Sequence, residues 1–479
     1  MTALVFYPVT KNYFYSDDFL HFWQIVNDSA GRFLLRMHGD HMYLTRNLVT
    51  LLLYKLVGMR AAPYFWLSFL THLVNVGLLY WLACRLTDSW RIACVTAALW
   101  GMAPVNEGAI GWFASYGHVL AGTCTLVVLI GVAGCRARRP LRPAKLWCWA
   151  VVTILGATCF GVGIAVALVL PIIAWLWVPL GRQRMVIALV FATTAVVIIA
   201  VYYTQSWMYG RIFAEPPPGG SISGVKDYWF LCLTSTVNLF GYGLVRLLLG
   251  ALYRAADYPG ARGYTVIALA LLAATIAVIR TRGQILRPVL ACGLVAIASY
   301  GLISMGRAPL EPMMGPRGLA ASLRYHYIAG MMVALCVGAV LRGILPGKHL
   351  PPWLSNAAVG IWAAIALAIA LRWGTPIFHY DFARRETLYA LNGISTLASA
   401  APPGGDVFVA NRPFRSIGFF MTMLPDQFPG WAAIFAMFHP DDMLDGHRVY
   451  FLVPEAQLAQ IEELGGRQVA ALLRPETVQ

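Results

Sequence analysis

Apolar stretches of about 20 residues recur along this chain from residue 62 to residue 372. The hydrocarbon core of a bilayer is roughly 30 Å thick and a helix rises about 1.5 Å per residue, so a run of about 20 apolar residues can span it. Two of these runs, 185–203 and 353–371, contain no charged residue at all. Only 12% of the 479 residues are charged, against about a quarter in a soluble domain. We therefore predict a polytopic integral membrane protein whose membrane part is all-α.

The net charge of +15 could indicate nucleic-acid binding, but its distribution indicates a membrane topology instead. Residues 374–479 hold 7 Arg and 11 acidic residues, which leaves 29 basic and 10 acidic residues in the remainder of the chain. Those basic residues gather in short loops between apolar runs, as they do in the cytoplasmic loops of membrane proteins. The nine cysteines show no CxxC or Cys/His spacing, so we expect neither a disulfide framework nor a structural zinc site.

The basic loops predict which segments cross the membrane. They lie within 85–91, 136–145, 182–184, 280–287 and 342–348. Between two cytoplasmic loops the chain must cross an even number of times. This predicts ten spans, at 62–84, 91–105, 115–135, two within 146–180, 185–203, 264–279, 288–305, 325–341 and 353–372. We divide 146–180 at 160–163, and we predict that 228–253, which carries Asn238 and Arg246, is an interfacial or re-entrant helix.

The same count divides the chain into three parts. Residues 1–61 form an outer loop, 62–373 form the transmembrane domain, and 374–479 form a small soluble module outside the cytoplasm. Residues 1–15 are too short to span, so we expect a further span upstream, which would make eleven. The run 47–60 is also too short and is predicted to lie along the membrane surface. In the tail, strands at 407–410 and 449–453 and a helix at 456–464 predict an α/β module.

An acidic pair in the outer loop is the first candidate for chemistry. Asp17 and Asp18 are flanked by aromatic residues at the start of a loop that lies on the membrane. One carboxylate could take a proton from an acceptor hydroxyl, while the second could hold a metal ion or raise the pKa of its neighbour. Equally, an Asp here could cap the helix that begins near Phe19. Further along, His38 and His41 could bind a metal ion with Asp40, or form part of a polar loop.

Two later outer loops carry further candidates. Glu107 is the only acidic residue between Asp88 and Glu215, and a lone carboxylate at the end of a span is a functional candidate by default; it could also be a helix-end charge facing headgroup water. The loop 306–324 contains arginines whose planar guanidinium can donate two hydrogen bonds to a phosphate. Arg324 directly precedes Tyr325, and the pair could instead be an interfacial anchor. The charged residues of this loop are Arg307, Glu311, Arg317 and Arg324.

Together these segments resemble the GT-C superfamily of membrane glycosyltransferases. These enzymes depend on polyprenyl-phosphate sugars and include the protein O-mannosyltransferases and the lipid A aminoarabinose transferases. The chain looks most like the dolichyl-phosphate-mannose-dependent, tetratricopeptide-bearing O-mannosyltransferases and their bacterial relatives. Four segments carry the resemblance: 14–19 with the acidic pair, 70–80 in the first long span, 103–112 with Pro104, Glu107 and Trp112, and the Arg-Tyr-His-Tyr sequence at 324–327.

The sequence departs from that pattern in several places. The first span and the tetratricopeptide repeats are absent. Leu44-Thr45-Arg46 replaces the Arg-Pro that follows the loop tyrosine, and Gly161-Val162-Gly163 stands where Lys-Glu is expected.

The resemblance implies a GT-C-like fold and an inverting transfer of a sugar from a polyprenyl phosphate to an extracytoplasmic glycan, lipid or protein acceptor. It implies the inner membrane of a bacterium, with the active site facing outward. Asp17 would be the catalytic base. The other implied roles fall to Asp18 beside it in catalysis, to Arg324, Tyr325 and Arg46 at the donor phosphate, to His41, Tyr43, Glu107 and Trp112 at the substrates, and to Asp18 with Glu107 if a divalent metal ion is bound.

Three other classes of protein compete with this interpretation. A transporter or lipid-handling protein would place polar groups near the middle of the membrane, often on broken helices with internal repeats, whereas the acidic groups here lie in outer loops. An envelope polysaccharide polymerase or ligase also spans the membrane many times and has a large outer loop, but generally relies on Arg and His there. A non-catalytic assembly protein is the third. Nucleic-acid binding is not expected.

Overall fold

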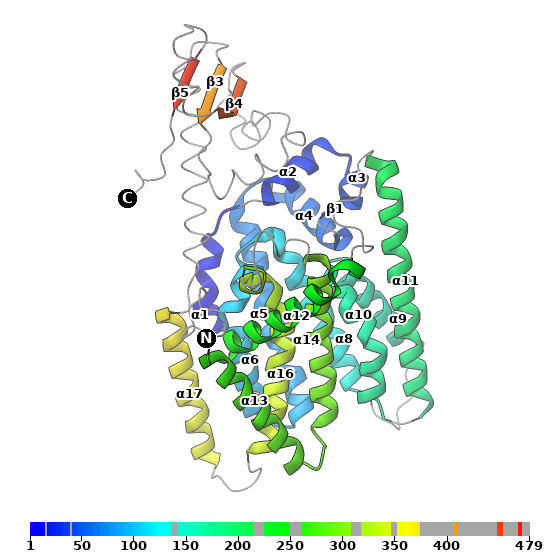
Figure 1. The fold of residues 1–479 in the computed structure, drawn as a ribbon, viewed down its shortest axis with the longest axis vertical. Helices are drawn as coiled ribbons and strands as arrows, with labels where there is room; N and C mark the ends of the chain where they lie inside the picture. Colours follow the sequence, from blue (N-terminus) through cyan, green and yellow to red (C-terminus); the bar gives the residue numbers. More distant parts are fainter. Residues whose placement is uncertain are drawn as a thin grey trace.

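Ten helices in the described part of the chain coincide with the ten predicted spans (Figure 1). The structure is a computed structural model that describes residues 1–14, 17–38, 41–135, 142–179, 181–213, 225–249, 261–307, 318–345, 352–373, 406–410, 448–453 and 468–471. The ten helices are α5 (Ala61–Thr87), α6 (Trp90–Gly101), α8 (Tyr116–Ala133), α9 (Pro143–Ala157), α10 (Gly161–Trp177), α11 (Arg182–Phe213), α13 (Ala261–Arg280), α14 (Leu286–Arg307), α16 (Tyr327–Ile344) and α17 (Pro352–Trp373).

Length and hydropathy support a multi-pass membrane protein. Seven helices among the described residues are long and apolar enough to cross a membrane, including α12 (Val225–Leu249), and three shorter apolar helices accompany them. Helix α6, with 12 residues, belongs to neither group. Large apolar side chains on the outside of the bundle are exposed, for example Leu189 and Val196 on α11. Such side chains have to be covered by lipid, because monomeric soluble proteins rarely expose large apolar surfaces.

The predicted division of 146–180 is confirmed, because α9 ends at Ala157 and α10 begins at Gly161. The turn between them is tied to the outer loop, since the hydroxyl groups of Thr45 and Thr158 are 2.6 Å apart. Gly161 allows a close approach here: a side chain at this position would collide with the imidazole of His41. The sequence Gly-Val-Gly thus permits both the helix break and the docking of the outer loop on it.

Helix α12 (Val225–Leu249) runs obliquely across the other helices in Figure 1. Near its start, the thiol of Cys232 lies 3.8 Å from the carbonyl oxygen of Ser304, in the last turn of α14. Near its end, the ring of Tyr242 stacks on His326, just before α16, with ring centroids 5.4 Å apart. Both contacts lie at the same end of the bundle, so α12 packs across the helix ends there. By length and hydropathy alone it could also cross a membrane.

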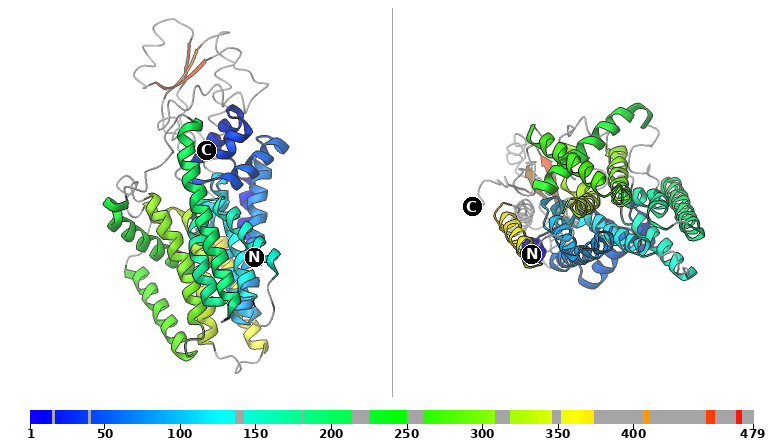
Figure 2. Two further views of the ribbon diagram at one scale, coloured as in Figure 1. Left: turned by 90° about the vertical axis from the view of Figure 1, so that its right-hand side faces the viewer. Right: turned by 90° about the horizontal axis from the view of Figure 1, so that it is seen from below.

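The short elements from α2 (Asp17–Asn27) to α4 (Leu44–Val57) gather at this same end, which we call the site end (Figures 1 and 2), whereas α1 (Thr2–Phe6) lies farther down the bundle beside α5. There, α4 buries polar side chains such as Asn47 and Thr50 and exposes Leu48, Leu52 and Leu56. An outward apolar face is what a helix lying against lipid presents. The other short elements are α1 (Thr2–Phe6), η1 (Tyr7–Lys11), α2 (Asp17–Asn27), α3 (Ala30–Leu35), β1 (Met37–His38), β2 (His41–Met42), α4 (Leu44–Val57), η2 (Pro104–Asn106), α7 (Glu107–Ile110), η3 (Phe113–Ser115) and η7 (Leu323–His326).

A buried hydrogen-bonded cluster joins four helices just below the site end. The ring of His72 on α5 lies 2.9 Å from the hydroxyl of Tyr327, which also accepts a hydrogen bond from the side chain of Asn75. The indole of Trp100 on α6 donates to the carbonyl of Tyr327, and Asn75 donates to the carbonyl of Val119 on α8. Because buried polar groups are costly unless they are paired, this cluster fixes the height at which α16 begins, and so the position of η7.

Three strands in the tail form a parallel sheet in the order β4-β3-β5. Two of them, β3 (Asp406–Ala410) and β4 (Arg448–Val453), occupy the segments in which strands were expected, and β5 (Gln468–Ala471) was not anticipated. The helix expected at 456–464 lies outside the described residues. The division into an outer loop, a transmembrane domain and a soluble module stays a prediction.

Candidate active site

Asp17 and His38 face each other at the site end. Asp17 opens α2 and His38 ends β1, and the carboxylate Oδ2 lies 3.7 Å from the imidazole Nε2. The two side chains are 20% and 30% exposed, respectively. Burial raises the pKa of Asp17, but His38, Arg324 and Arg307 together outweigh burial and leave that pKa below its usual value. Asp17 is therefore a carboxylate at neutral pH, with its charge facing cationic groups.

The β1–β2 hairpin holds two histidines on one face. Its antiparallel register pairs Met37 with Met42 and His38 with His41, and cross-strand partners project from the same face of a sheet. The methionines pack on the other side, Met37 against Tyr209 of α11 and its neighbours. This apolar anchor directs both histidines toward Asp17 and the helix ends.

His41 belongs to a group of nitrogen-bearing side chains beside the carboxylate. Arg307 at the end of α14 donates a hydrogen bond of 3.4 Å from Nη2 to Nε2 of His41. Phe160 lies between His41 and His118, with ring centroids 4.3 Å and 3.8 Å away. Burial, followed by the charge of Arg307, lowers the pKa of His41 well below its usual value, so its imidazole is neutral and can accept this hydrogen bond.

Unpaired donors stand out in this group. Among the described residues, Nε of Arg307 and Nε2 of His118 are buried and have no hydrogen-bond partner. An unpaired buried polar group costs about 1–3 kcal/mol, and more if it is charged. His41 and His118 also face the charge of Arg324. The group contains hydrogen-bond donors that have no acceptor, so an anion would complete it and a further donor would not.

Arg324 is held by aromatic rings. Its guanidinium carbon lies 4.7 Å from the centre of the Trp112 ring and 4.8 Å from that of Tyr325, and Nη2 donates to the Tyr325 hydroxyl over 3.1 Å. The backbone of Arg324 packs directly on Gly108, where any side chain would collide with it. The loop that carries Glu107 and Trp112 and the segment that begins at Arg324 are thus in contact.

The acidic pair is divided between two environments. Asp18 is only 2% exposed, and its charge faces Arg46 and Tyr64 in the interior. The guanidinium of Arg46 is fully buried, lies 5.2 Å from the centre of the Tyr43 ring, and donates to the side chain of Asn47. Arg46, expected at the donor phosphate, therefore already has protein partners, and Tyr43 lies between it and His41.

Glu107 is buried at the contact between α7 and η7. Neither carboxylate oxygen has a hydrogen-bond partner among the described residues. Burial raises the pKa of Glu107 to about 8, although the charge of Arg246 on α12 acts in the opposite direction. The side chain is therefore mainly protonated at neutral pH.

The metal site considered for Asp18 and Glu107 is not assembled among the described residues. Asp18 faces Arg46 and Glu107 faces Arg246, and no group of three or more His, Cys, Asp or Glu side chains in the described ranges could hold a metal ion. Asp40, the third member of the alternative set with His38 and His41, lies outside those ranges. These residues do not fit a divalent ion, and we derive no step through one.

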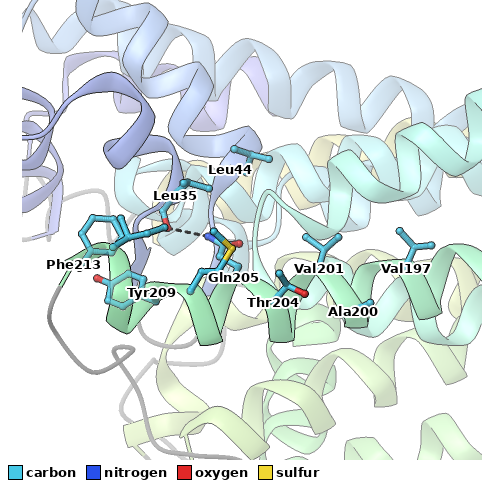
Figure 3. A pocket seen from close by; sticks show the side chains of 11 residues that line it. Leu35, Leu44, Val197, Ala200, Val201, Thr204, Gln205, Tyr209 and Phe213 are labelled. Atoms are coloured by element: carbon cyan, nitrogen blue, oxygen red, sulfur yellow. Dashed lines mark hydrogen bonds between the residues drawn. The ribbon is translucent and has the colours of Figure 1, made fainter.

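An apolar groove adjoins the hairpin on the side of α11 (Figure 3). Its volume is about 380 Å³, and it is lined by Leu35 and Leu44 on one side and by nine residues of α11 from Val197 to Phe213 on the other. Gln205 of α11 donates a hydrogen bond of 3.0 Å to the carbonyl of Leu35. Arg36 fixes the same contact, because its guanidinium lies 4.1 Å from the centre of the Phe213 ring.

Sequence reasoning missed two members of the site. His118 follows η3 at the start of an apolar run, where it resembles an ordinary core residue, and Phe160 was considered only as part of a helix break. The sequence signal for His118 was weak: a histidine in an apolar run, two residues after a tyrosine. Glu311 and Arg317, which share a loop with Arg307, lie outside the described residues.

Comparison with solved structures identifies the fold. The structure of ArnT from Cupriavidus metallidurans bound to undecaprenyl phosphate matches 96% of this chain and 93% of its own, with a TM-score of 0.51 and 15% sequence identity. The apo structure of the same protein also matches 96% of this chain and 93% of its own at 15% sequence identity, with a TM-score of 0.38. No protein-family profile and no curated protein matches the sequence. The expected all-α polytopic membrane fold is confirmed, and this chain shares it with ArnT.

Proposed function

We propose that this protein is a membrane glycosyltransferase that moves a sugar from a polyprenyl-phosphate donor to an acceptor hydroxyl at the site end, with inversion of the anomeric carbon. The observation that carries the proposal is the cationic group beside Asp17. Arg307 and Arg324 are close enough for both charges to act on Asp17, His41 and His118, and buried donors among them lack partners.

A phosphate fits this group better than any other anion class that a membrane supplies. Planar guanidinium groups bind phosphate oxygens through paired hydrogen bonds. The unpaired Nε of Arg307 and Nε2 of His118 would supply two further donors. The fold supports the same choice, because ArnT, a GT-C glycosyltransferase with this fold, was solved with undecaprenyl phosphate. Arg324 and Tyr325 keep the role expected from the sequence, and Arg307 joins them.

Asp17 would act as the base in a single displacement. The acceptor oxygen would attack the anomeric carbon from the side opposite the phosphate, which inverts the configuration, and its proton would pass to the carboxylate. The departing lipid phosphate needs its negative charge stabilised, which the arginines can do. Asp17 and the phosphate would thus face the same two arginines from opposite sides of the sugar.

The groove along α11 suits the hydrocarbon tail of such a donor. Its walls are almost entirely apolar, and it lies directly behind the hairpin that carries His38 and His41. A chain of isoprene units could leave the phosphate past His41 and lie along α11. Burial of hydrocarbon there would contribute about 25 cal/mol per Å² of apolar surface removed from water.

The site end would face away from the cytoplasm. The described basic residues Arg85, Arg182, Arg280 and Arg342 lie at helix ends remote from α2, and positive residues mark the cytoplasmic side. For the membrane and the acceptor we keep what the sequence led us to expect: the inner membrane of a bacterium, and a glycan, lipid or protein acceptor.

The test is transfer by the purified protein in vesicles, with a panel of radiolabelled polyprenyl-phosphate sugars and membrane extracts as acceptors. We expect label to move from at least one donor to an acceptor and the Asp17→Asn variant to be inactive. If the wild-type protein instead carries donors across the bilayer without cleaving them, the transporter alternative holds. Undiminished transfer by Asp17→Asn would contradict the assignment of the base.

A further inference from the structure

Asp17 must lose a proton once per turnover before it can act again. The carboxylate faces cationic groups that keep its pKa low, so the protonated form readily gives its proton to a nearby basic group. The nearest such group among the described residues is the imidazole of His38, 3.7 Å away. This distance is only slightly longer than a direct hydrogen bond, so a small rotation of either side chain would bring the two atoms into contact.

We propose that His38 is the proton outlet of the reaction, a positioning residue that takes the acceptor proton from Asp17 and passes it to solvent. This inference rests on the proposed function and extends it. As the acceptor oxygen bonds to the anomeric carbon, the bond from that carbon to the phosphate oxygen breaks, and the lipid phosphate leaves with the electron pair. The acceptor proton goes to Oδ2 of Asp17, then to Nε2 of His38, which becomes an imidazolium, and finally to water.

Neither of the neighbouring histidines can take this role. His21 is 4% exposed and lies 3.4 Å from the side-chain oxygen of Gln24, and burial lowers its pKa well below the usual value. His41 accepts a hydrogen bond from Arg307 on the nitrogen that a proton would occupy. His38 combines a carboxylate neighbour with 30% exposure to solvent. The titratable and charged groups around it are Asp17, His21 and His41, with Arg307 and Arg324 beyond Asp17.

The experiment compares wild type with His38→Gln in vesicles, with kcat and the donor KM measured from pH 5 to 9. Gln keeps a polar side chain but cannot take up a proton. We expect kcat to fall roughly 10- to 100-fold, with the donor KM changed less than about twofold. The wild-type kcat should rise with pH as a basic group becomes available to take the proton, and the variant should lack this rise. Added imidazole buffer should restore turnover of the variant in proportion to its concentration and leave wild type unchanged.

Met37→Leu is the matched control, because Met37 sits beside His38 on the opposite face of the same strand. It should keep the wild-type pH profile and show no response to imidazole. A wild-type profile without the rise would overturn the proposal, even if His38→Gln failed to accumulate. So would a His38→Gln variant that is active without imidazole or unresponsive to it. If wild type transfers sugar from no polyprenyl-phosphate donor, the proposed function fails instead.

Discussion

Two adjacent carboxylates in the first turn of α2 have opposite surroundings. Asp17 lies at the rim of the site beside His38, whereas Asp18 is buried with its charge facing Arg46. Successive residues of a helix point about 100° apart, so a pair at the start of a helix can serve two directions at once. The cap interpretation is compatible with this geometry, since acidic side chains favour a helix start, but it does not explain the cationic groups that face Asp17.

Substitution of the pair should separate catalysis from folding. Asp17→Asn should reduce kcat by about 10²- to 10⁴-fold, because general-base help is worth that much, and the protein should still accumulate in membranes. Asp18→Asn should lower the amount of folded protein, because it leaves the buried charge of Arg46 less compensated. Asp88→Asn is the control, because Asp88 directly follows α5 at the end remote from the site. It should change neither kcat nor the amount of folded protein. Rate assays and quantification of purified protein provide the comparison; wild-type kcat in Asp17→Asn would leave Asp17 as a helix-end residue only.

Arg324 should contribute to donor binding rather than to acceptor binding. A charge-assisted hydrogen bond is worth about 1.5–3 kcal/mol, so Arg324→Ala should weaken donor use roughly ten- to a hundredfold. Arg324→Lys should recover only part of this loss, because Lys lacks the planar fork and the stacking on Trp112. Arg211→Ala is the control, since Arg211 also stacks on a tryptophan, Trp207, but on α11. Kinetics with donor and acceptor varied separately decide the matter; equal losses for both substrates, or full recovery with Lys, would make Arg324 an interfacial anchor.

Glu107 should make the protein less stable as the pH rises. Its pKa is raised to about 8 in the folded protein from an ordinary value of 4.5, so the folded state holds the proton more tightly than the unfolded chain. Stability is therefore greatest when the pH is below the ordinary pKa of 4.5, and it falls as the pH rises through the pKa of the folded protein, about 8. Glu107→Gln should remove this fall, so that the two proteins unfold at similar temperatures at pH 5 and the variant unfolds higher at pH 8. Parallel thermal unfolding curves at both pH values would show that Glu107 is not buried in its acid form.

Helices were predictable from the sequence because each depends on a local property. A span requires only a sufficient run of apolar residues, and the break before α10 required only two glycines near one another. Tail strands β3 and β4 followed from β-branched and aromatic runs. Residues of the acidic pair and of the 324–327 segment could be singled out because polar groups are conspicuous beside membrane spans.

Assembly of the site was not predictable in the same way. His41, His118, Phe160 and Arg307 come from β2, α8, the α9–α10 turn and α14, and only the packing of these elements brings them together. Their separation along the chain leaves no local pattern. The burial of Arg46 is a second example, since a loop arginine beside a tyrosine gives no sign that it will be enclosed.

The groove on α11 offers a test of the lipid donor through one helix. Ala200→Trp should fill it, because Ala200 is among the lining residues. The KM for a long-chain polyprenyl donor should rise, while a water-soluble donor with one or two isoprene units should be used as before. Val196→Trp, on the exposed surface of the same helix, is the control. Equal effects of Ala200→Trp on both donors would indicate distortion of the site rather than loss of tail binding.

The directions of successive helices connect these local features to a side of the membrane. Helices α13, α14 and α16 alternate in direction, so that the Arg280–Leu286 turn and Arg342 lie away from the site end while Arg307 and Arg324 lie at it. Arginine is therefore present at both ends, but for different reasons. Arg85 and Arg342, at helix ends remote from the site, follow the distribution expected of a cytoplasmic side, whereas Arg307 and Arg324 face the carboxylate of Asp17.

The side on which the tail lies is the last prediction. Helix α17 (Pro352–Trp373) follows the basic segment 342–348 and runs along the side of the bundle, away from the end remote from the site (Figure 1). Because positive loops stay in the cytoplasm, residue 374 and everything after it should lie on the other side, together with the site end. A reporter fused after Gln479 should therefore be active if it functions only outside the cytoplasm and inactive if it functions only inside, and a reporter inserted within 346–350 should behave in the opposite way. A cytoplasmic reporter that is active at both positions would show that α17 does not cross the membrane. One that is active after Gln479 but not within 346–350 would invert the topology and place the site end inside, which would contradict the outward-facing reaction proposed above.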